Sequence, residues 1–387
     1  MDKRNSKLFL VLFLGTLSAF GPFVTDLYLP ALPFMSSFFG ADTSTIQLTL
    51  TGSMVGLSLG QLLIGPISDK YGRRLPLFIS LSFYLVSTIL IILLPNIYAM
   101  IVLRFIQGVS SAGAVVISRA ISADLFKGRE MTQFFALLMA VNGLAPILSP
   151  IVGSLLLQFT NWRGIFIALF LIGVVLIFTL FKFHESLTTD KRINLPLSKV
   201  YSTMNTVIKN KNFVILVFIQ GFSLAAMFGY IAASPFILQN YYNLSPFLYS
   251  LCFGLNGFAI VVGSKMSSNF SEINSIRLGS SLMLIISCYL AIILTFRLSI
   301  IFVEVGFFLL LLGLGFILPS VSSLAMNMER RYAGSASAIL GFVPFFLGGV
   351  VSPLVGIINI FYATSVVIFL CSLISFLLYT KIRNIDI

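Results

Sequence analysis

The feature that most constrains this sequence is the length of its apolar runs that contain no charged residue. The stretches from Thr43 to Ser68 and from Leu75 to Leu103 are charge-free, and a third runs from Asn212 to Ser264. A helix of about 20 apolar residues crosses the hydrocarbon core of a bilayer. Runs of this length are too apolar for surface helices of a soluble protein. The sequence therefore predicts an all-α integral membrane protein.

The composition agrees with this class. Hydrophobic residues make up 58% of the chain and charged residues only 9%, whereas about a quarter of a soluble domain is charged. The net charge of +12 raises the question of a nucleic-acid partner. No basic cluster is longer than a few residues, so we expect no nucleic acid to bind and expect the lipid bilayer as the surroundings.

Twelve spans account for the apolar runs. The run from Asn212 to Ser264 is long enough for two spans and must turn near Asn240–Pro246, and the last run turns near Asn359. The expected spans are residues 8–34, 46–68, 75–94, 97–118, 132–157, 164–183, 212–238, 246–266, 277–296, 299–326, 333–357 and 361–380.

The distribution of cations gives the orientation. Of the 24 Lys and Arg residues, 21 fall in segments that this layout places on one side. Arg163 and Arg297 fall on the other side, and Arg104 lies inside a span. Because cytoplasmic loops collect Lys and Arg, we expect a multi-pass protein with both termini in the cytoplasm.

The chain also divides into two similar halves. We expect a six-helix bundle over 1–184, a cytoplasmic linker over 185–211 and a second six-helix bundle over 212–387. The segment Tyr28–Met35 resembles Tyr230–Ile237 at an offset of 202 residues, which indicates a duplicated unit. In duplicated transporters the substrate site lies between the halves. Apolar residues at helical spacing in the linker favour an amphipathic helix, with a solvated tether as the alternative.

Three ionisable residues inside the spans are candidates for function. A charge at the centre of a bilayer costs about 2.5–3.5 kcal/mol, so each requires a cavity or a partner. Asp26 and Arg104 lie at similar depths, which predicts a proton-coupling pair; the alternative is a static ion pair. Glu304 lies nearer the outer end, as a substrate ligand or as a residue that extends to the surface near Arg297.

A lipophilic substrate that can carry a charge suits the residues that share helical faces with this pair. Phe23, Leu29 and Pro30 accompany Asp26, and Gln107 accompanies Arg104. The predicted substrate-binding residues are Phe23, Leu29, Pro30, Gln107, Asn142 and Glu304.

The fifth span contains two prolines between two glycines: Gly143, Pro146, Pro150 and Gly153. Proline removes backbone hydrogen bonds and kinks a helix, and glycine permits close helix contact. The pattern predicts a bend that seals the two halves in one state, or simply a bent packing helix.

No group of residues points to catalysis or to a metal. Cys252, Cys288 and Cys371 lie in different apolar runs, and His184 is the single histidine. We therefore expect no enzyme activity, no metal and no cofactor.

Four motifs resemble the major facilitator superfamily. Gly65–Arg74 is similar to its signature loop, and Thr25–Pro33 is similar to the first-span motif of the bicyclomycin-resistance (Bcr/CflA) group of drug exporters. The segment Leu103–Gly108, continuing to Arg119 and Asp124–Phe126, resembles the fourth-span motif of that group. Ala145-Pro146 with Pro150 and Gly153 resembles the antiporter motif of the fifth span, although Ala145 and Ser154 depart from its Gly-Pro form.

The resemblance implies a proton-driven exporter of drug-like compounds. It implies two pseudo-symmetric six-helix bundles in a bacterial inner membrane, working as a monomer on the proton gradient. Asp26 would carry the proton and Arg104 would modulate it. A conformational latch would comprise Gly65, Asp69, Arg73, Arg74 and Asp124.

Two other transport functions remain open. The chain can be a dedicated exporter of one metabolite or siderophore, because the motifs do not specify the substrate. It can also be a proton-coupled uptake symporter, because the same helices support movement in either direction.

Overall fold

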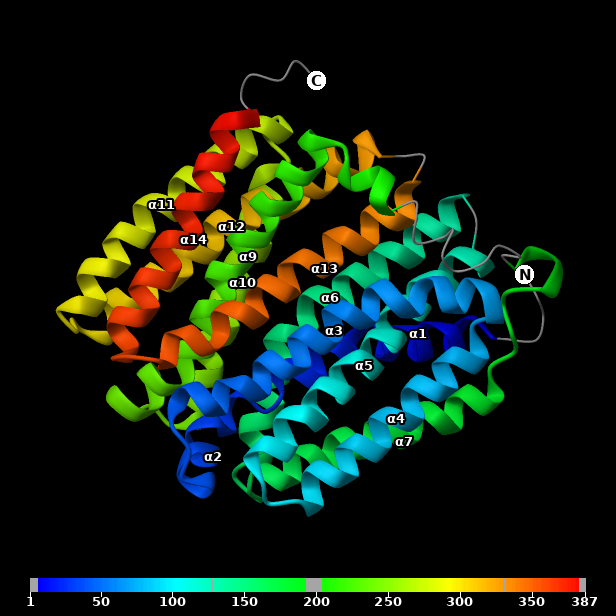
Figure 1. Cartoon of the computed structure of the whole chain (residues 1–387), viewed down its shortest axis with the longest axis horizontal. Coiled ribbons are helices and arrows are strands. Elements are labelled where there is room, and N and C mark those ends of the chain that lie inside the picture. Colours follow the sequence, from blue (N-terminus) through cyan, green and yellow to red (C-terminus); the bar gives the residue numbers. More distant parts are fainter. Residues whose placement is uncertain (1–5, 127, 193–203, 330–331, 383–387) are drawn as a thin grey trace. The chain divides into compact units, whose positions relative to one another are not determined.

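The computed structural model describes residues 6–126, 128–192, 204–329 and 332–382, and it is helical almost throughout (Figure 1). The helices of the first half are α1 (Lys7–Asp26), α2 (Leu32–Phe39), α3 (Thr43–Tyr71), α4 (Arg74–Leu93), α5 (Ile97–Leu125), α6 (Gly128–Leu156) and α7 (Trp162–Lys182). Those of the second half are α9 (Lys211–Pro235), α10 (Pro246–Ser267), α11 (Glu272–Thr295), α12 (Ile300–Met328), α13 (Ala333–Val351) and α14 (Ile360–Ile382).

The predicted fold class is confirmed. Among the described residues, eleven helical segments are long and apolar enough to cross a membrane. The remaining expected span, 132–157, coincides with α6, which is 29 residues long. The apolar segment Gly143–Leu156 forms its second half. The protein is thus an all-helical membrane protein.

The first span is broken where a continuous helix was expected. α1 ends at Asp26, a short 3₁₀ turn covers Leu29–Ala31, and α2 begins at Leu32. Pro30 and Pro33 explain the break, since proline has no backbone N–H and clashes with the preceding helical turn. Asp26 therefore lies at the end of a helix, inside the hydrophobic segment.

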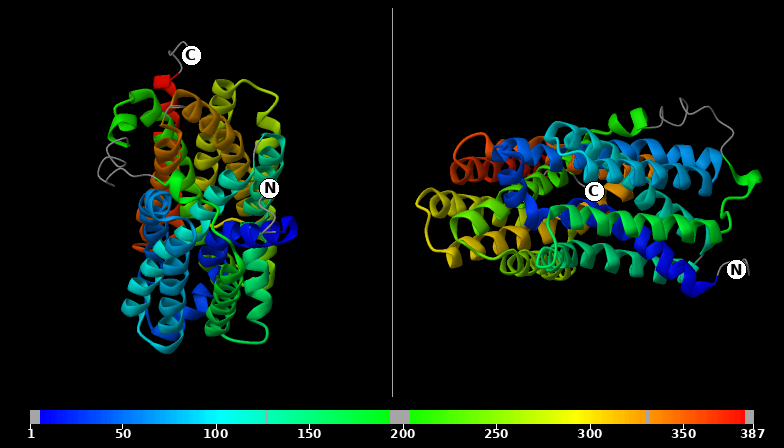
Figure 2. Two further views of the ribbon diagram at one scale, coloured as in Figure 1. Left: turned by 90° about the vertical axis from the view of Figure 1, so that its right-hand side faces the viewer. Right: turned by 90° about the horizontal axis from the view of Figure 1, so that it is seen from below.

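The helices form two compact units. The first comprises Met1–Ala31 with Gly52–Val200, and the second comprises Leu32–Thr51 with Tyr201–Ile387. In the first unit α1 packs on α5 and α6, and α4 packs on α5 and α7. In the second unit α12 packs on α10 and α11, and α9 on α13 and α14. The helices of each unit run lengthwise beside one another (Figure 2). The bundle boundaries expected at residues 184 and 211 stay a prediction.

Two glycines bring α3 and α5 together in the first unit. A Cβ at Gly56 would collide with the backbone carbonyl of Phe105, and one at Gly108 would collide with the carbonyl of Ser53. Small residues allow membrane helices to approach this closely, and the gain is van der Waals contact. This contact sets Ser53 beside the polar residues of α5.

The predicted amphipathic linker helix is described only in part. Residues 204–208 are helical, while Leu197, Val200 and Tyr201 lie outside the described residues.

Candidate functional site

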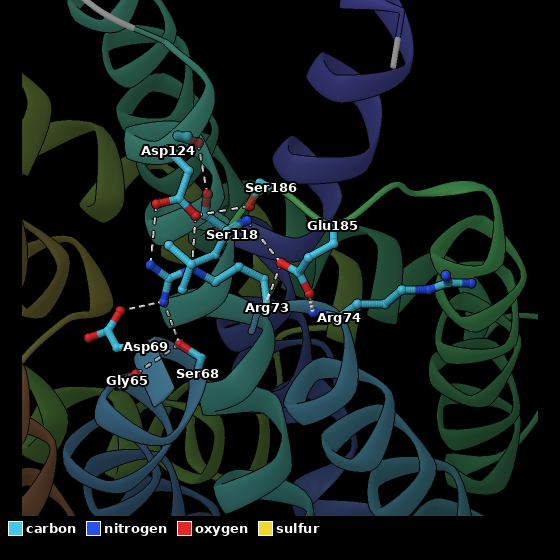
Figure 3. Close-up of polar contacts among 11 residues, drawn as sticks. Gly65, Ser68, Asp69, Arg73, Arg74, Ser118, Asp124, Glu185 and Ser186 are labelled. Carbon is cyan, nitrogen blue, oxygen red and sulfur yellow. Dashed lines mark hydrogen bonds and ion pairs between the residues drawn. The ribbon is translucent and has the colours of Figure 1, made fainter. Parts of the chain in front are cut away.

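A charged cluster occupies the turn between α3 and α4, and its centre is Arg73 (Figure 3). This side chain is only 5% exposed. Its guanidinium donates to Asp69 Oδ1 at 2.5 Å, to Ser68 Oγ at 2.8 Å and to Asp124 Oδ2 at 2.9 Å. Two carboxylates from different helices therefore meet one buried cation, and three predicted latch residues are brought together.

Glu185, which the sequence analysis did not select, completes this cluster. Its carboxylate accepts the backbone N–H of Arg73 at 2.9 Å and that of Arg74 at 3.0 Å (Figure 3). The first N–H groups of a helix lack partners within the helix, and a negative charge there is favourable. Glu185 thus caps α4. The neighbouring Ser186 donates to Asp124 Oδ2 at 2.9 Å, so the chain after α7 joins the cluster twice.

The carboxylates keep Arg73 charged. Burial alone would lower the pKa of the Arg73 guanidinium, but the hydrogen bond and charge of Asp124, followed by those of Asp69, outweigh it and raise the pKa. Gly72 precedes this residue with φ of +90°, and a Cβ there would lie 2.8 Å from Glu185 Oε2. A side chain at position 72 would disturb both the turn and the cap.

The other predicted latch residues lie beside these. Arg74 also donates from its side chain to the carbonyl of Phe181 at 3.2 Å, which ties α4 to α7. Gly65 supplies the carbonyl that accepts from Ser68 Oγ at 2.8 Å. All five predicted latch residues therefore belong to one corner of the first unit.

A second polar site surrounds Arg104 in the interior of the first unit. Arg104 is fully buried. It donates to Gln107 Oε1 at 2.6 Å and to Ser53 Oγ at 3.0 Å, and its guanidinium carbon lies 4.2 Å from the centre of the Tyr28 ring. Gln107 in turn donates to Thr88 Oγ1 at 2.7 Å. Such an arrangement satisfies a buried cation with hydrogen bonds and an aromatic face.

Asp26 belongs to the same unit as Arg104. It is 8% exposed and lies at the end of α1. Its neighbour Thr25 donates to the Gly21 carbonyl at 3.2 Å. The structure thus gathers an acid, a base and an amide in one unit, at the break in the first span. That Asp26 carries the proton and Arg104 modulates it stays a prediction.

The remaining predicted substrate ligands are distributed differently. Leu29 and Pro30 are buried in the turn after α1, whereas Phe23 is half-buried. Asn142 lies in α6, but its side chain is outside the described residues. Glu304 belongs to the second unit, where it accepts from Asn256 Nδ2 at 2.9 Å.

The proline-rich part of α6 packs closely against α1 at one point. A Cβ at Gly153 would collide with the carbonyl of Leu27, the residue after Asp26. Gly143 has open space around it, so close approach does not explain that glycine. Pro146 and Pro150 both lie inside the helix. α6 therefore contacts the break in the first span directly.

Sequence reasoning missed the neutral partners of these sites. Ser53, Thr88 and Tyr28 bind or cover Arg104 and Gln107, but single hydroxyl residues in apolar helices carry no distinctive spacing. Glu185 did carry a signal, because it is an acidic residue directly after a span on the side of the Gly65–Arg74 loop.

The comparisons with known proteins identify the family. The model of the Major Facilitator Superfamily matches residues 8–353. The chain belongs to this superfamily. Superfamily members are transporters rather than enzymes, so this protein is a secondary transporter of small molecules.

Relatives and solved structures agree with the superfamily. The chain is 37% identical to the "Uncharacterized MFS-type transporter YdgK" of Bacillus subtilis, over 91% of this chain and 90% of that one. It is 27% identical to the "Bicyclomycin resistance protein homolog" of Haemophilus influenzae, over 92% and 90%. The partially occluded, inward-open xylose transporter XylE of E. coli matches with a TM-score of 0.73 at 12% identity, over 98% of each chain. That likeness concerns the superfamily fold alone.

Proposed function

We propose that this protein exports small lipophilic, drug-like compounds from the cytoplasm in exchange for protons, by alternating access. The observation that carries the proposal is the buried acid Asp26, set at the break in the first span and in the same unit as the buried cation Arg104. A buried acid near a single cation can gain and lose a proton as its surroundings change. In this scheme an external proton binds Asp26 and releases the substrate.

The direction and the substrate class are supported by likeness. The bicyclomycin-resistance homologue carries drug resistance in its name and matches nearly the whole chain. The cations collect on one side of the predicted spans, which favours cytoplasmic termini in a bacterial inner membrane. The charged cluster around Arg73 acts in this scheme as the latch that stabilises one conformation of the cycle.

Transport by everted membrane vesicles tests the proposal. An imposed pH gradient, acid inside, should drive uptake of compounds from a drug panel into the vesicles. Adding substrate should in turn release protons. Asp26→Asn should abolish substrate-driven proton movement, while Asp190→Asn, an exposed acid of the linker, should leave it at the parent rate.

The outcomes separate the alternatives. Transport of several unrelated compounds supports multidrug export, and transport of one compound class indicates a dedicated exporter. Substrate movement in the same direction as protons would mean uptake symport. Parent-rate proton movement in Asp26→Asn would refute the assignment of Asp26.

A further inference from the structure

The carboxylate of Glu304 is a partly buried acid that the proposed mechanism does not use. Glu304 is the fifth residue of α12, so it lies about 6 Å from the beginning of that helix. Oε2 accepts from Asn256 Nδ2 at 2.9 Å. Oε1 is buried and, among the described residues, receives no hydrogen bond. One oxygen is thus open to a proton.

The partner Asn256 suits both forms of the acid. Its Nδ2 also lies 3.0 Å from the hydroxyl of Tyr230, and its Oδ1 is buried without a donor among the described residues. An amide presents a donor on one side and an acceptor on the other. Ionised Glu304 accepts from the amide nitrogen, and protonated Glu304 can donate to the amide oxygen once the amide turns over. The hydrogen bond therefore survives a change of protonation.

The helices packed on α12 carry their charged residues far from Glu304. Lys211 begins α9, Lys265 lies in the last turn of α10, and Glu272 and Arg277 lie at the start of α11, all at the end opposite to the start of α12. The described residues of α13 bear no acidic or basic side chain. Arg297, in the turn before α12, instead lies over the rings of Tyr241 and Phe361, at 5.8 and 5.2 Å. A carboxylate inside a membrane is costly without a cation, and a bound proton removes that cost. The nearest titratable groups are Tyr230, which shares Asn256 with Glu304, and Cys252, which lines the same groove.

The position of this network repeats that of the Arg104 site. Tyr230 corresponds to Tyr28 at the offset of 202 residues, and Asn256 corresponds to Ser53 at an offset of 203. Glu304 lies one helical turn before Phe307, the counterpart of Arg104. Both units thus place a tyrosine, a polar residue and a charged residue in corresponding segments, although Tyr28 lies in the turn after α1 and Tyr230 lies within α9. The charged residue is Arg104 in the first unit and Glu304 in the second.

A groove gives access to the acid from outside the bundle. It lies between α10 and α12, has a volume of about 460 Å³, and includes Glu304 in its wall. Exposed apolar residues such as Leu251 and Ile301 form much of the rest. Because α10 and α12 both begin at this end, Glu304 lies about one helical turn from the predicted external surface.

We propose that Glu304, held by Asn256 and Tyr230, is a second proton-binding site of this transporter. A proton from the external side binds Oε1 and converts the carboxylate to a neutral acid, and its release on the internal side restores the charge. Each transport cycle then moves a proton in addition to the one on Asp26. The proposal rests on proton-coupled transport as proposed above.

Infrared difference spectroscopy of the full chain in lipid membranes tests the site without transport. Protonated carboxylic acids show a carbonyl stretch that ionised carboxylates lack, so a pH titration counts the buried acids. The parent protein should show bands from both Asp26 and Glu304. Glu304→Gln should lose one band and Asp26→Asn the other. Glu272→Gln, an exposed acid of the same unit, is the matched control and should leave both bands in place.

A second variant keeps the test decisive where Glu304→Gln fails to fold. Asn256→Leu retains the acid but removes its hydrogen bond, and it should move the midpoint of the Glu304 band by about one pH unit or more. An unchanged spectrum in Glu304→Gln, or an unmoved midpoint in Asn256→Leu, would overturn the second site. If Glu304→Gln loses only the Glu304 band, but the parent protein shows no substrate-coupled proton movement in vesicles, the second proton-binding site is supported and the proposed function is refuted.

Discussion

Replacing Arg104 is the most direct test of how the first unit holds a buried charge. The side chain is fully buried, donates two hydrogen bonds and lies over the ring of Tyr28. Arg104→Met keeps an unbranched apolar stem but has no charge and no donor. It removes the donor to Gln107 Oε1 and Ser53 Oγ, and it removes the buried positive charge from the unit that holds Asp26.

The expected loss follows from these contacts. Removing one partner of a buried ionic group costs about 3–5 kcal/mol, because the remaining charge stays buried. Arg104→Lys keeps the charge, but a single ammonium replaces the forked guanidinium and reaches fewer acceptors. Loss of one hydrogen bond to a charged group costs about 1.5–3 kcal/mol. Arg104→Lys should therefore fall between the parent and Arg104→Met.

Equilibrium unfolding in detergent micelles with increasing fractions of SDS measures these free energies. The decisive comparison is with Asp26→Asn as the background. If the unpaired charge of Asp26 causes much of the loss, Arg104→Met should cost less there, by about 1 kcal/mol or more. Equal costs in the two backgrounds would show that Arg104 does not act on Asp26. A stability of Arg104→Met equal to the parent would refute the account of the whole site.

Two further predictions concern the helix caps. Glu185→Ala removes the acceptor of two N–H groups at the start of α4 and should lower the free energy of unfolding by about 1.5–3 kcal/mol, measured in the same micelles. Glu185→Gln keeps one acceptor oxygen and should lose less; equal losses in the two variants would show that a single neutral acceptor does not stabilise this turn. The second cap is Asp42, just before α3. A hydrogen bond from the Thr45 side chain lowers the pKa of Asp42 below its ordinary value of 3.8, and hydrogen bonds from backbone N–H groups add to this; the small effect of burial opposes them. This contribution is present above pH 3.8 and disappears as the pH falls through the lowered value, so Asp42→Ala should destabilise the protein at pH 7 and not near pH 2. A loss that persists in acid would contradict this explanation.

Much of the fold was predictable because membranes impose simple rules. Charge-free runs and the one-sided distribution of Lys and Arg located the helices well. The break after Asp26 was not predicted, although Pro30 and Pro33 were visible, because apolar composition continues through it. Hydropathy reports where a chain can lie in a bilayer, and backbone chemistry decides whether the helix is continuous.

The sites were predictable in their charged members and in Gln107, which accepts from Arg104. Asp69, Arg73 and Asp124 were selected from the resemblance to the superfamily motifs, and their side chains meet in the structure. Their neutral and capping partners were not found, because Ser53 and Thr88 resemble dozens of other hydroxyl residues. Glu304 was selected, but its partner Asn256 was not, since only the packing of α10 on α12 brings the two together.

The cap on α4 has a consequence for the synthesis of the chain. The carboxylate that satisfies the start of α4 comes from Glu185, more than a hundred residues further along and beyond α7. In a nascent chain the second and third spans are therefore made before the carboxylate that accepts the backbone N–H groups of the turn between them. Only when the ribosome has made the sixth span, and Glu185 has reached the membrane surface, can the turn close. The cluster thus marks the completion of the first bundle before the second begins.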